Sequence, residues 1–387
     1  MSKRVGLEIS LAIAEAVKLA DTDMIAAYPI TPQTHIVERL AEMVAEGELK
    51  AAYINAESEH SAISLCVGSS IAGARTFTAT SAQGLALMHE IMYITAALRL
   101  PIVMVVVNRA MSGPLSIWGD HSDVMGERDT GWIQLFAQNG QEAFDMTLQA
   151  FRIAEDHRVL LPVIVNIDGF TLSHVIEPIE ILDQTELNKF MRTFKPKYPL
   201  DPRRPLTFGA FAIPEYYMEA KKQVEQAIFS SKAVIEEVWQ EFDKLYGRHY
   251  TPIESYKTED AKILLLTLGG IGETAQTAVD EMREQGIKVG LLKLVMYRPF
   301  PIQELRDACK AAQTLVICER AMSIGGQGGP IGFEVRSAFY NHRTDLQIHD
   351  IILGLGGRDV KVDDFKVLVK HASEKKPKEY ELIGVRE

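Results

Sequence analysis

Three side chains that could do chemistry follow apolar runs of this sequence. Thr31 offers a hydroxyl, Glu59 a carboxyl and Arg109 a guanidinium. A guanidinium grips a carboxylate with two parallel hydrogen bonds, and a helix N-terminus favours the charged form of an acid while burial opposes it. Their spacing predicts one shared site, provided that the elements before them end at the same place.

The apolar runs themselves read as buried strands, because they are short, nearly continuous and followed by polar or small residues. In the segments between these strands, apolar residues recur at the spacing of a helix. We predict strands at Met24–Ala27, Ala51–Ile54, Thr76–Ala79 and Ile102–Val107, and helices at Leu7–Leu19, Ser61–Ala74, Gly84–Leu98 and Gln141–Ala154.

This alternation predicts an α/β fold with a parallel sheet and right-handed crossovers. Ligands of such sheets bind beyond the carboxyl ends of the strands. Thr31, Glu59, Arg109 and the segment 80–84, which contains Gln83, all follow strands closely. They should therefore face one crevice.

Each of the three residues also has a structural interpretation. Glu59 could be an acid that only favours a helix N-terminus. Arg109 could be one half of a structural ion pair. Thr31, held between two prolines, could be an ordinary turn hydroxyl.

Length and composition favour an ordinary soluble protein of two domains. The chain has 387 residues, of which 47% are hydrophobic and 24% charged, too many for one usual core. A net charge of −11 argues against nucleic acid and anionic membranes as partners. No apolar run approaches the ~20 residues needed to cross a bilayer.

The three cysteines, Cys66, Cys309 and Cys318, are widely spaced. Their number and spacing fit buried thiols in a reducing cytoplasm. They are too few for an iron–sulfur cluster, which usually needs about four thiolates.

We place the domain boundary at residues 259/260, giving a first domain of residues 1–259 and a second of residues 260–387. A proline-rich, basic segment at 195–206 reads as an extended surface stretch, and Pro214–Tyr246 as a long helix with an interruption. The second domain should be a smaller α/β unit with strands at Lys262–Leu268, Ile287–Leu294, Thr314–Cys318 and Gln347–Leu353, and a helix at Glu273–Glu284.

The segment 112–129 is a long polar loop around Trp118, and loops of this length tend to be functional. His121 lies in it between Asp120 and Asp123. The spacing matches no standard set of metal ligands, so we expect no metal site in this chain.

Several ordered blocks resemble the α subunit of 2-oxoacid:ferredoxin oxidoreductases, and most of all the pyruvate:ferredoxin oxidoreductases (pyruvate synthases). They run along nearly the whole chain: Tyr-Pro-Ile-Thr-Pro at 28–32, Glu-Ser-Glu-His at 57–60, Thr-Ala-Thr-Ser-Ala-Gln-Gly-Leu-Ala-Leu-Met-His-Glu at 78–90, Pro-Ile-Val-Met-Val-Val-Val-Asn-Arg-Ala at 101–110, Arg-Asp-Thr-Gly-Trp-Ile-Gln at 128–134, Tyr-Arg-Pro-Phe-Pro at 297–301 and Gly-Leu-Gly-Gly-Arg-Asp-Val at 354–360.

The resemblance implies a pyrimidine-type thiamine diphosphate-binding domain followed by a transketolase-C-terminal-like domain. It implies that Glu59 bonds N1′ of the aminopyrimidine ring, with Tyr28, Pro29, Ile30 and Gln83 also at the cofactor, and that Thr31 and Arg109 hold the substrate carboxylate. Some relatives carry Arg at the position of Thr31, so Thr31 favours a substrate with one carboxylate.

The sequence contains neither the Gly-Asp-Gly…Asn pattern that carries Mg²⁺ and diphosphate nor a cysteine cluster motif. The resemblance therefore implies a β subunit with the thiamine diphosphate and Mg²⁺ motif, and γ and ferredoxin-like δ subunits, or fusions of them, with [4Fe-4S] clusters. Ferredoxin, coenzyme A and a 2-oxoacid complete the expected partners.

The expected reaction is oxidative decarboxylation of pyruvate with coenzyme A to acetyl-CoA and CO₂, with electrons passed to ferredoxin, or the reverse synthesis. Three alternatives stay open: the same chemistry on branched-chain or other 2-oxoacids, another thiamine enzyme of the transketolase or 2-oxoacid dehydrogenase kind, and a non-catalytic scaffold subunit.

Overall fold

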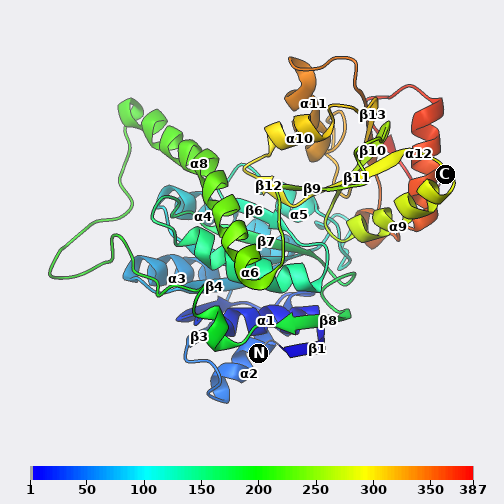
Figure 1. Cartoon of the computed structure of the whole chain (residues 1–387). Coiled ribbons are helices and arrows are strands. Elements are labelled where there is room, and N and C mark those ends of the chain that lie inside the picture. The colour runs from blue at the N-terminus through cyan, green and yellow to red at the C-terminus, as the bar shows by residue number, and fades with distance from the viewer. Residues whose placement is uncertain (1–2, 387) are drawn as a thin grey trace.

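The computed structural model describes residues 3–386, and its larger sheet has seven strands in the order β12-β6-β7-β5-β4-β2-β3 (Figure 1). All neighbours in it are parallel except β12, which pairs antiparallel with β6. The strands are β2 (Met24–Ala27), β3 (Ala52–Asn55), β4 (Thr76–Thr80), β5 (Ile102–Asn108), β6 (Ile133–Phe136), β7 (Val163–Asp168) and β12 (Met296–Arg298).

Helices cover both faces of this sheet. The side chains of β5 show why, since Val103, Val105 and Val107 enter one hydrophobic core while Met104 and Val106 enter another. A strand buried on both faces has no polar side, which explains the continuous apolar runs. The helices are α1 (Ile9–Leu19), α2 (Thr34–Ala45) and α6 (Gly140–Ala154) with the first core, and α3 (Glu59–Ala72) and α4 (Ala82–Ala97) with the second.

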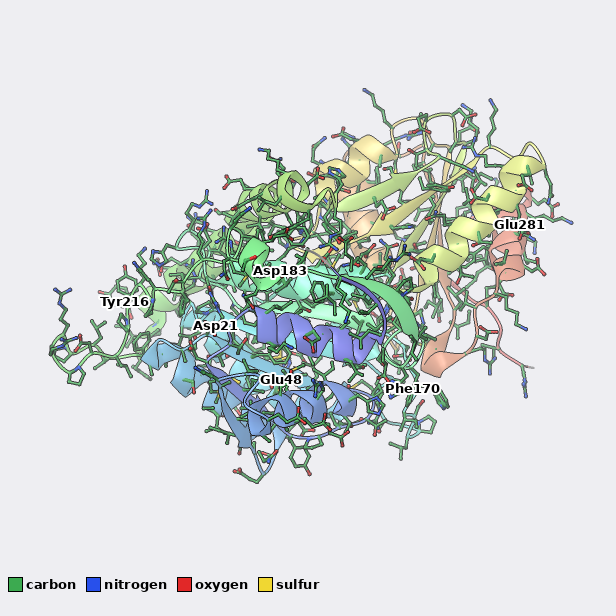
Figure 2. All side chains as sticks on the ribbon, turned by 60° about the horizontal axis from the view of Figure 1, so that its bottom comes forward. Asp21, Glu48, Phe170, Asp183, Tyr216 and Glu281 are labelled. Carbon is green, nitrogen blue, oxygen red and sulfur yellow. The ribbon has the colours of Figure 1, made fainter. Side chains whose placement is uncertain are left out.

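Smaller elements complete the first half of the chain. A two-stranded antiparallel sheet joins β1 (Lys3–Glu8) to β8 (Ile176–Ile181). Short helices are α5 (Ser122–Met125) and α7 (Gln184–Leu187), and the 33-residue α8 spans Pro214–Tyr246. The N-terminal part of α8 projects from the body, so that Tyr216 lies at one end of the molecule and Glu281 at the other (Figure 2).

The second sheet has six strands in the order β15-β14-β13-β10-β11-β9. Its strands are β9 (Ile253–Tyr256), β10 (Ile263–Leu268), β11 (Val289–Leu294), β13 (Thr314–Glu319), β14 (Gln347–Ile352) and β15 (Glu381–Leu382), of which only β9 runs antiparallel to its neighbour. Around it lie α9 (Ile271–Glu284), α10 (Ile302–Ala308), α11 (Pro330–Tyr340), η1 (Leu355–Gly357) and α12 (Val362–Glu374).

The two sheets share one of the hydrophobic cores, which includes Met104 and Phe136 from the first and Leu266 and Ile317 from the second. A buried ionic group also crosses between them. The carboxylate of Asp168, at the end of β7, pairs with Nε2 of His121 at 2.6 Å and with Nη1 of Arg320 at 3.1 Å. It also accepts a hydrogen bond from the backbone N–H of Gly270 at 2.7 Å. Although burial opposes it, Arg320 and His121 hold the pKa of Asp168 below its usual range.

The parallel α/β fold and the four strands predicted for the first sheet are confirmed. Two predictions are wrong in detail. The first helix begins at Ile9, because Lys3–Glu8 pairs with β8 as a strand, and α8 runs without interruption. In residues 3–386, no helix is both long and apolar enough to cross a membrane.

Candidate active site

The carboxyl ends of β2, β3, β4 and β5 meet at one edge of the first sheet. Strand β2 leads through α2 to β3 on one side, whereas β4 leads through α4 to β5 on the other. The connections therefore diverge between β2 and β4, and such a switch point is where open α/β sheets bind ligands. The segments 28–33, 56–58, 81–83 and 109–121 all emerge at this edge.

Glu59 begins α3, but its side chain does not cap the helix. Ser58 is the N-cap residue, and its hydroxyl accepts the N–H of Ser61 at 3.2 Å. The Glu59 side chain is only 6% exposed and forms no hydrogen bond or ion pair within residues 3–386. It lies over Gly84 of α4, where a Cβ atom would meet Oε1 of Glu59 at 2.6 Å. The absence of a side chain at Gly84 therefore leaves the space that the carboxyl group of Glu59 occupies.

The turn from β4 into α4 carries several buried polar atoms without a partner. Oγ1 of Thr80, Oγ of Ser81 and Oε1 of Gln83 all lack a hydrogen bond in the part of the chain that the structure describes. Buried polar groups of native proteins are nearly always paired. Three such atoms in one turn, beside the unpaired Glu59, mark a place for a polar ligand.

Arg109 leaves β5 at the same edge and is 7% exposed. Its Nη1 donates to the carbonyl oxygen of Thr31 at 2.9 Å, and its Nε to that of Ser116 at 2.8 Å. Among the described residues the guanidinium has no ion pair, and Nη2 has no protein acceptor. Burial lowers the pKa of Arg109, against the opposing effect of Asp123. One face of a buried cation is thus open.

The turn after β2 brings Thr31 directly to Arg109. The side-chain amide of Gln33 closes this turn, because its Nε2 donates to the carbonyl oxygen of Tyr28 at 3.0 Å. Tyr28, Pro29 and Thr31 are exposed at the edge of the sheet, and Ile30 is partly buried. The structure thus joins Thr31 to Arg109, and Glu59 to the turn that holds Gln83, while Tyr28, Pro29 and Ile30 line the same edge without a direct bond to either group.

Two further residues of this edge were not predicted to belong to the site. Asp123 accepts four hydrogen bonds in a fully buried place, and Ser112 bonds Nε2 of Gln83. The only sequence feature that pointed to this region was the length and polarity of the tryptophan-containing loop 112–129. In it, His121 pairs with Asp168 and Asp120 with the N–H of Gly356, and residues 3–386 contain no cluster that could hold a metal.

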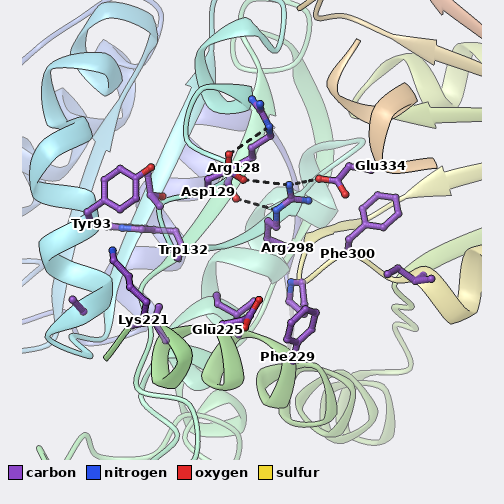
Figure 3. A pocket seen from close by; sticks show the side chains of 17 residues that line it. Tyr93, Arg128, Asp129, Trp132, Lys221, Glu225, Phe229, Arg298, Phe300 and Glu334 are labelled. Carbon is purple, nitrogen blue, oxygen red and sulfur yellow. Dashed lines mark hydrogen bonds and ion pairs between the residues drawn. The ribbon is translucent and has the colours of Figure 1, made fainter. Parts of the chain in front are cut away.

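A separate cavity of about 400 Å³ lies between α4, α8 and the second half of the chain (Figure 3). Its walls include Tyr93, Phe229 and Phe300, and Arg298 reaches Glu334 across it. The cavity adjoins the segment before β6, so it lies by the amino ends of the strands. It shares no residue with the edge that holds Glu59 and Arg109.

Two family models match the chain. The model described as "Pyruvate flavodoxin/ferredoxin oxidoreductase, thiamine diP-bdg" matches residues 15–240. The model described as "Pyruvate:ferredoxin oxidoreductase core domain II" matches residues 261–365.

Curated relatives are similar along nearly their whole length. Pyruvate synthase subunit PorA of Methanocaldococcus jannaschii is 45% identical over 97% of this chain and 96% of its own. The subunit of the same name from Pyrococcus furiosus is 49% identical over 90% and 88%. Ketoisovalerate oxidoreductase subunit VorA of Pyrococcus abyssi is 43% identical over 93% and 91%.

Solved structures share the fold. A 2-oxoglutarate:ferredoxin oxidoreductase from Magnetococcus marinus superposes with a TM-score of 0.73 at 19% identity, covering 95% of this chain and 65% of that one. A split-gene transketolase superposes with a TM-score of 0.51 at 10% identity, covering 95% and 98%.

Proposed function

Because the chain belongs to the pyruvate flavodoxin/ferredoxin oxidoreductase family, we propose that it is the α subunit of a thiamine-dependent 2-oxoacid:ferredoxin oxidoreductase acting on pyruvate. The enzyme converts pyruvate and coenzyme A into acetyl-CoA and CO₂ with electrons passed to ferredoxin, or runs the reverse synthesis. The relatives named pyruvate synthase subunit, similar over nearly their whole length, support this assignment.

The residues at the sheet edge suit the aminopyrimidine half of thiamine diphosphate. Such a ring offers an exocyclic NH₂ donor and an acceptor nitrogen at N1′. The edge offers Oε1 of Gln83, which lacks a donor, and the carboxyl group of Glu59, which can share a proton with N1′. The carboxyl group of Glu59 packs closely over Gly84, and this close packing holds the group in one place. Tyr28, Pro29 and Ile30 form the adjoining exposed wall.

Thiamine diphosphate, when bound, supplies the carbanion-stabilising centre that decarboxylation of a 2-oxoacid requires. Glu59 accepts and returns the proton at N1′ of the aminopyrimidine ring. An acid that is buried beside the turn from β4 into α4 and only 6% exposed is suited to this exchange. Because Glu59 forms no hydrogen bond or ion pair within residues 3–386, its oxygens are free for that ring nitrogen.

The observation that carries the proposal is the open face of Arg109. A buried guanidinium without a carboxylate partner is costly, and a substrate carboxylate would complete it. The hydroxyl of Thr31 lies on the same turn as the carbonyl that already orients Arg109. One open cation and one neutral hydroxyl fit a substrate with a single carboxylate, such as pyruvate.

The chain works as one subunit of a larger enzyme, as the names of its relatives indicate. A β subunit supplies the diphosphate and Mg²⁺ site, and γ and ferredoxin-like δ subunits, or fusions of them, supply the [4Fe-4S] clusters. Exposed apolar side chains around the site, among them Met111, Leu115 and Trp118, suit the contact with the β subunit. The free, buried thiols of Cys66, Cys309 and Cys318 suit a cytoplasmic enzyme.

The division into residues 1–259 and 260–387 is part of the same proposal. The first part would hold the cofactor, and the second would close the sheet edge through the group around Asp168. The start of the second sheet at Ile253 and the return of β12 to the first sheet tie the two parts closely together.

Branched-chain 2-oxoacids are the second candidate substrates, because a ketoisovalerate oxidoreductase subunit is nearly as similar as the pyruvate synthase subunits. The test is anaerobic purification of the tagged chain with its partners from its host. Viologen reduction is then measured with coenzyme A and pyruvate, 2-oxoisovalerate or 2-oxoglutarate. The proposal requires the highest kcat/KM for pyruvate; preference for 2-oxoisovalerate would change the substrate, and no reduction by a cofactor-loaded complex would overturn it.

A further inference from the structure

Asp123 lies beneath the candidate active site, between the ends of two neighbouring strands. It belongs to the short helix α5 and is 3% exposed. The proposed reaction gives it no role, because it faces backbone and amide groups rather than the open edge. A buried carboxylate without a direct ion pair is expensive, so its retention needs a reason.

The Asp123 carboxylate accepts hydrogen bonds from two directions. Its Oδ2 receives the backbone N–H of Ala82 at 3.0 Å and that of Arg109 at 2.9 Å. Its Oδ1 receives Nδ2 of Asn108 at 3.1 Å and the N–H of Val124 at 2.7 Å. Ala82 starts α4 after β4, whereas Asn108 and Arg109 end β5. One oxygen therefore links the two strand ends.

Both linked backbones carry site residues. Ala82 has φ of +42°, a conformation that costs a side-chain-bearing residue about 1–3 kcal/mol and persists only where its surroundings hold it. Gln83 and Gly84, the seat of Glu59, follow it at once. On the other strand, the N–H that Asp123 accepts belongs to Arg109 itself.

We propose that Asp123 is a positioning residue. Its carboxylate holds the backbone of Arg109 at a fixed distance from the turn against which Glu59 packs, and so places Arg109 for the carboxylate of the 2-oxoacid. This inference rests on the proposed role of Arg109 in binding the substrate carboxylate. The geometry requires a carboxylate, because only a group with two acceptor oxygens can receive all four donors. An asparagine would place its own NH₂ group against at least one N–H.

Electrostatics agree with this geometry. Burial raises the pKa of Asp123 to about 6, and the four donors oppose that rise. At neutral pH the group is therefore ionised and accepts through both oxygens. The nearby charge of Arg109 is stabilised without being used up in a direct ion pair.

The test compares Asp123→Asn with Asp145→Asn in the complete enzyme complex. Asp145 is a matched control, since it is equally buried, accepts from Oη of Tyr250 at 2.6 Å and forms an ion pair with Arg248 at 3.0 Å, but lies on α6 away from the site. KM and kcat for the preferred 2-oxoacid are measured by viologen reduction, together with the Tm of each complex.

Asp123→Asn should raise KM about tenfold, the effect of one lost charge-assisted hydrogen bond, with a smaller change in kcat. Asp145→Asn should lower Tm at most and leave KM unchanged. An unchanged KM in an assembled Asp123→Asn complex would overturn the inference. If that variant does not assemble, Asn108→Ser removes the side-chain donor to Asp123 together with its second bond, to Oδ1 of Asn166, and an unchanged KM in that variant would also overturn the inference.

Arg109→Lys is measured in parallel, because it separates this inference from the proposed function. Lysine keeps the charge but loses the fork, so KM should rise with little change in kcat. If Arg109→Lys raises KM and Asp123→Asn does not, only the positioning role fails. If neither variant changes KM, the assignment of Arg109 to the substrate fails as well.

Discussion

At the scale of single residues, the buried ionisable side chains of this chain are of two kinds: some lie at the sheet edge without an ion pair within residues 3–386, and one is kept uncharged by its surroundings. Glu59 and Arg109 lie at the sheet edge without an ion pair to any residue of 3–386, although Arg109 donates to the carbonyl oxygens of Thr31 and Ser116. Glu142, where α6 meets the second half of the chain, is handled differently. Burial raises its pKa to about 8, and the neighbouring carboxylates of Glu254 and Glu273 raise it as well. This acid keeps its proton at neutral pH.

The raised pKa of Glu142 predicts a pH-dependent stability. The folded state binds the proton more tightly than the unfolded chain, so the stabilisation is complete below the usual glutamate pKa and is lost as pH rises to about 8. Glu142→Gln removes this dependence. Its Tm should match that of the parent chain near pH 5 and exceed it by at least about 3 °C at pH 9. Calorimetry from pH 5 to 9 checks this, with the exposed Glu219→Gln as control; a constant difference would contradict it.

Residue types and strand ends made Thr31, Glu59 and Arg109 candidates, and the family resemblance then supplied the predicted role of each. Asp123 could not be selected in the same way, because its partners are backbone N–H groups of Ala82 and Arg109, 41 and 14 residues away. Backbone donors leave no pattern in a sequence. The seat formed by Gly84 was equally hidden, since it depends on how closely two helices approach.

At the scale of elements, the site depends on the close approach of the N-termini of α3 and α4. A methyl group on Gly84 would lie 2.5 Å from Oγ1 of Thr80 and 2.6 Å from Oε1 of Glu59. The carboxyl end of Glu59 is the more mobile of these neighbours. It would therefore move first, and the backbone of both helices could stay in place.

Gly84→Ala should consequently reduce turnover much more than stability. We expect turnover to fall at least about tenfold, because a displacement of the acid by about 1 Å impairs proton transfer. Gly68→Ala in α3 is the control, since an added methyl there meets nothing within 4 Å. That change should stabilise the chain by about 0.5–1 kcal/mol and leave turnover unchanged. Viologen reduction and thermal unfolding of both complexes check the pair, and normal turnover in Gly84→Ala would argue against the seat.

Periodicity placed the inner strands and their helices because both faces of those strands are buried. It misplaced the start of the first helix, since the apolar spacing near Leu7 suits a strand paired with β8 as well as a helix. The pairing of β12 with β6 joins residues more than 150 positions apart, and no local pattern carries such a contact. The uninterrupted α8 follows from the absence of Gly and Pro after Pro214 within it.

At the scale of the whole molecule, the proposed function gives this chain one half of a cofactor site. Glu59 and Gln83 can hold the pyrimidine side, but residues 3–386 contain no cluster for the Mg²⁺ that accompanies the diphosphate. Apolar side chains such as Leu115 and Trp118 are exposed beside the site. Such exposed side chains suit a contact with the β subunit of the proposed complex.

The isolated chain should therefore bind thiamine diphosphate only weakly. Calorimetric titration with thiamine diphosphate and Mg²⁺ should give no binding tighter than about 1 μM for this chain alone, about −8 kcal/mol. The complete complex, stripped of cofactor and titrated in the same buffer, should bind much more tightly. Sub-micromolar binding by the isolated chain would show that it holds the whole site.

The most direct test of the central claim is the turnover of two complete complexes that differ only at Glu59. Anaerobic viologen reduction with pyruvate and coenzyme A is measured for the parent complex and for Glu59→Gln, with equal cofactor and cluster content in both. Glutamine keeps the size of the side chain but cannot accept the proton at N1′, so turnover should fall at least about 100-fold. Equal turnover in the two complexes would contradict a catalytic role for this chain and leave it as a scaffold.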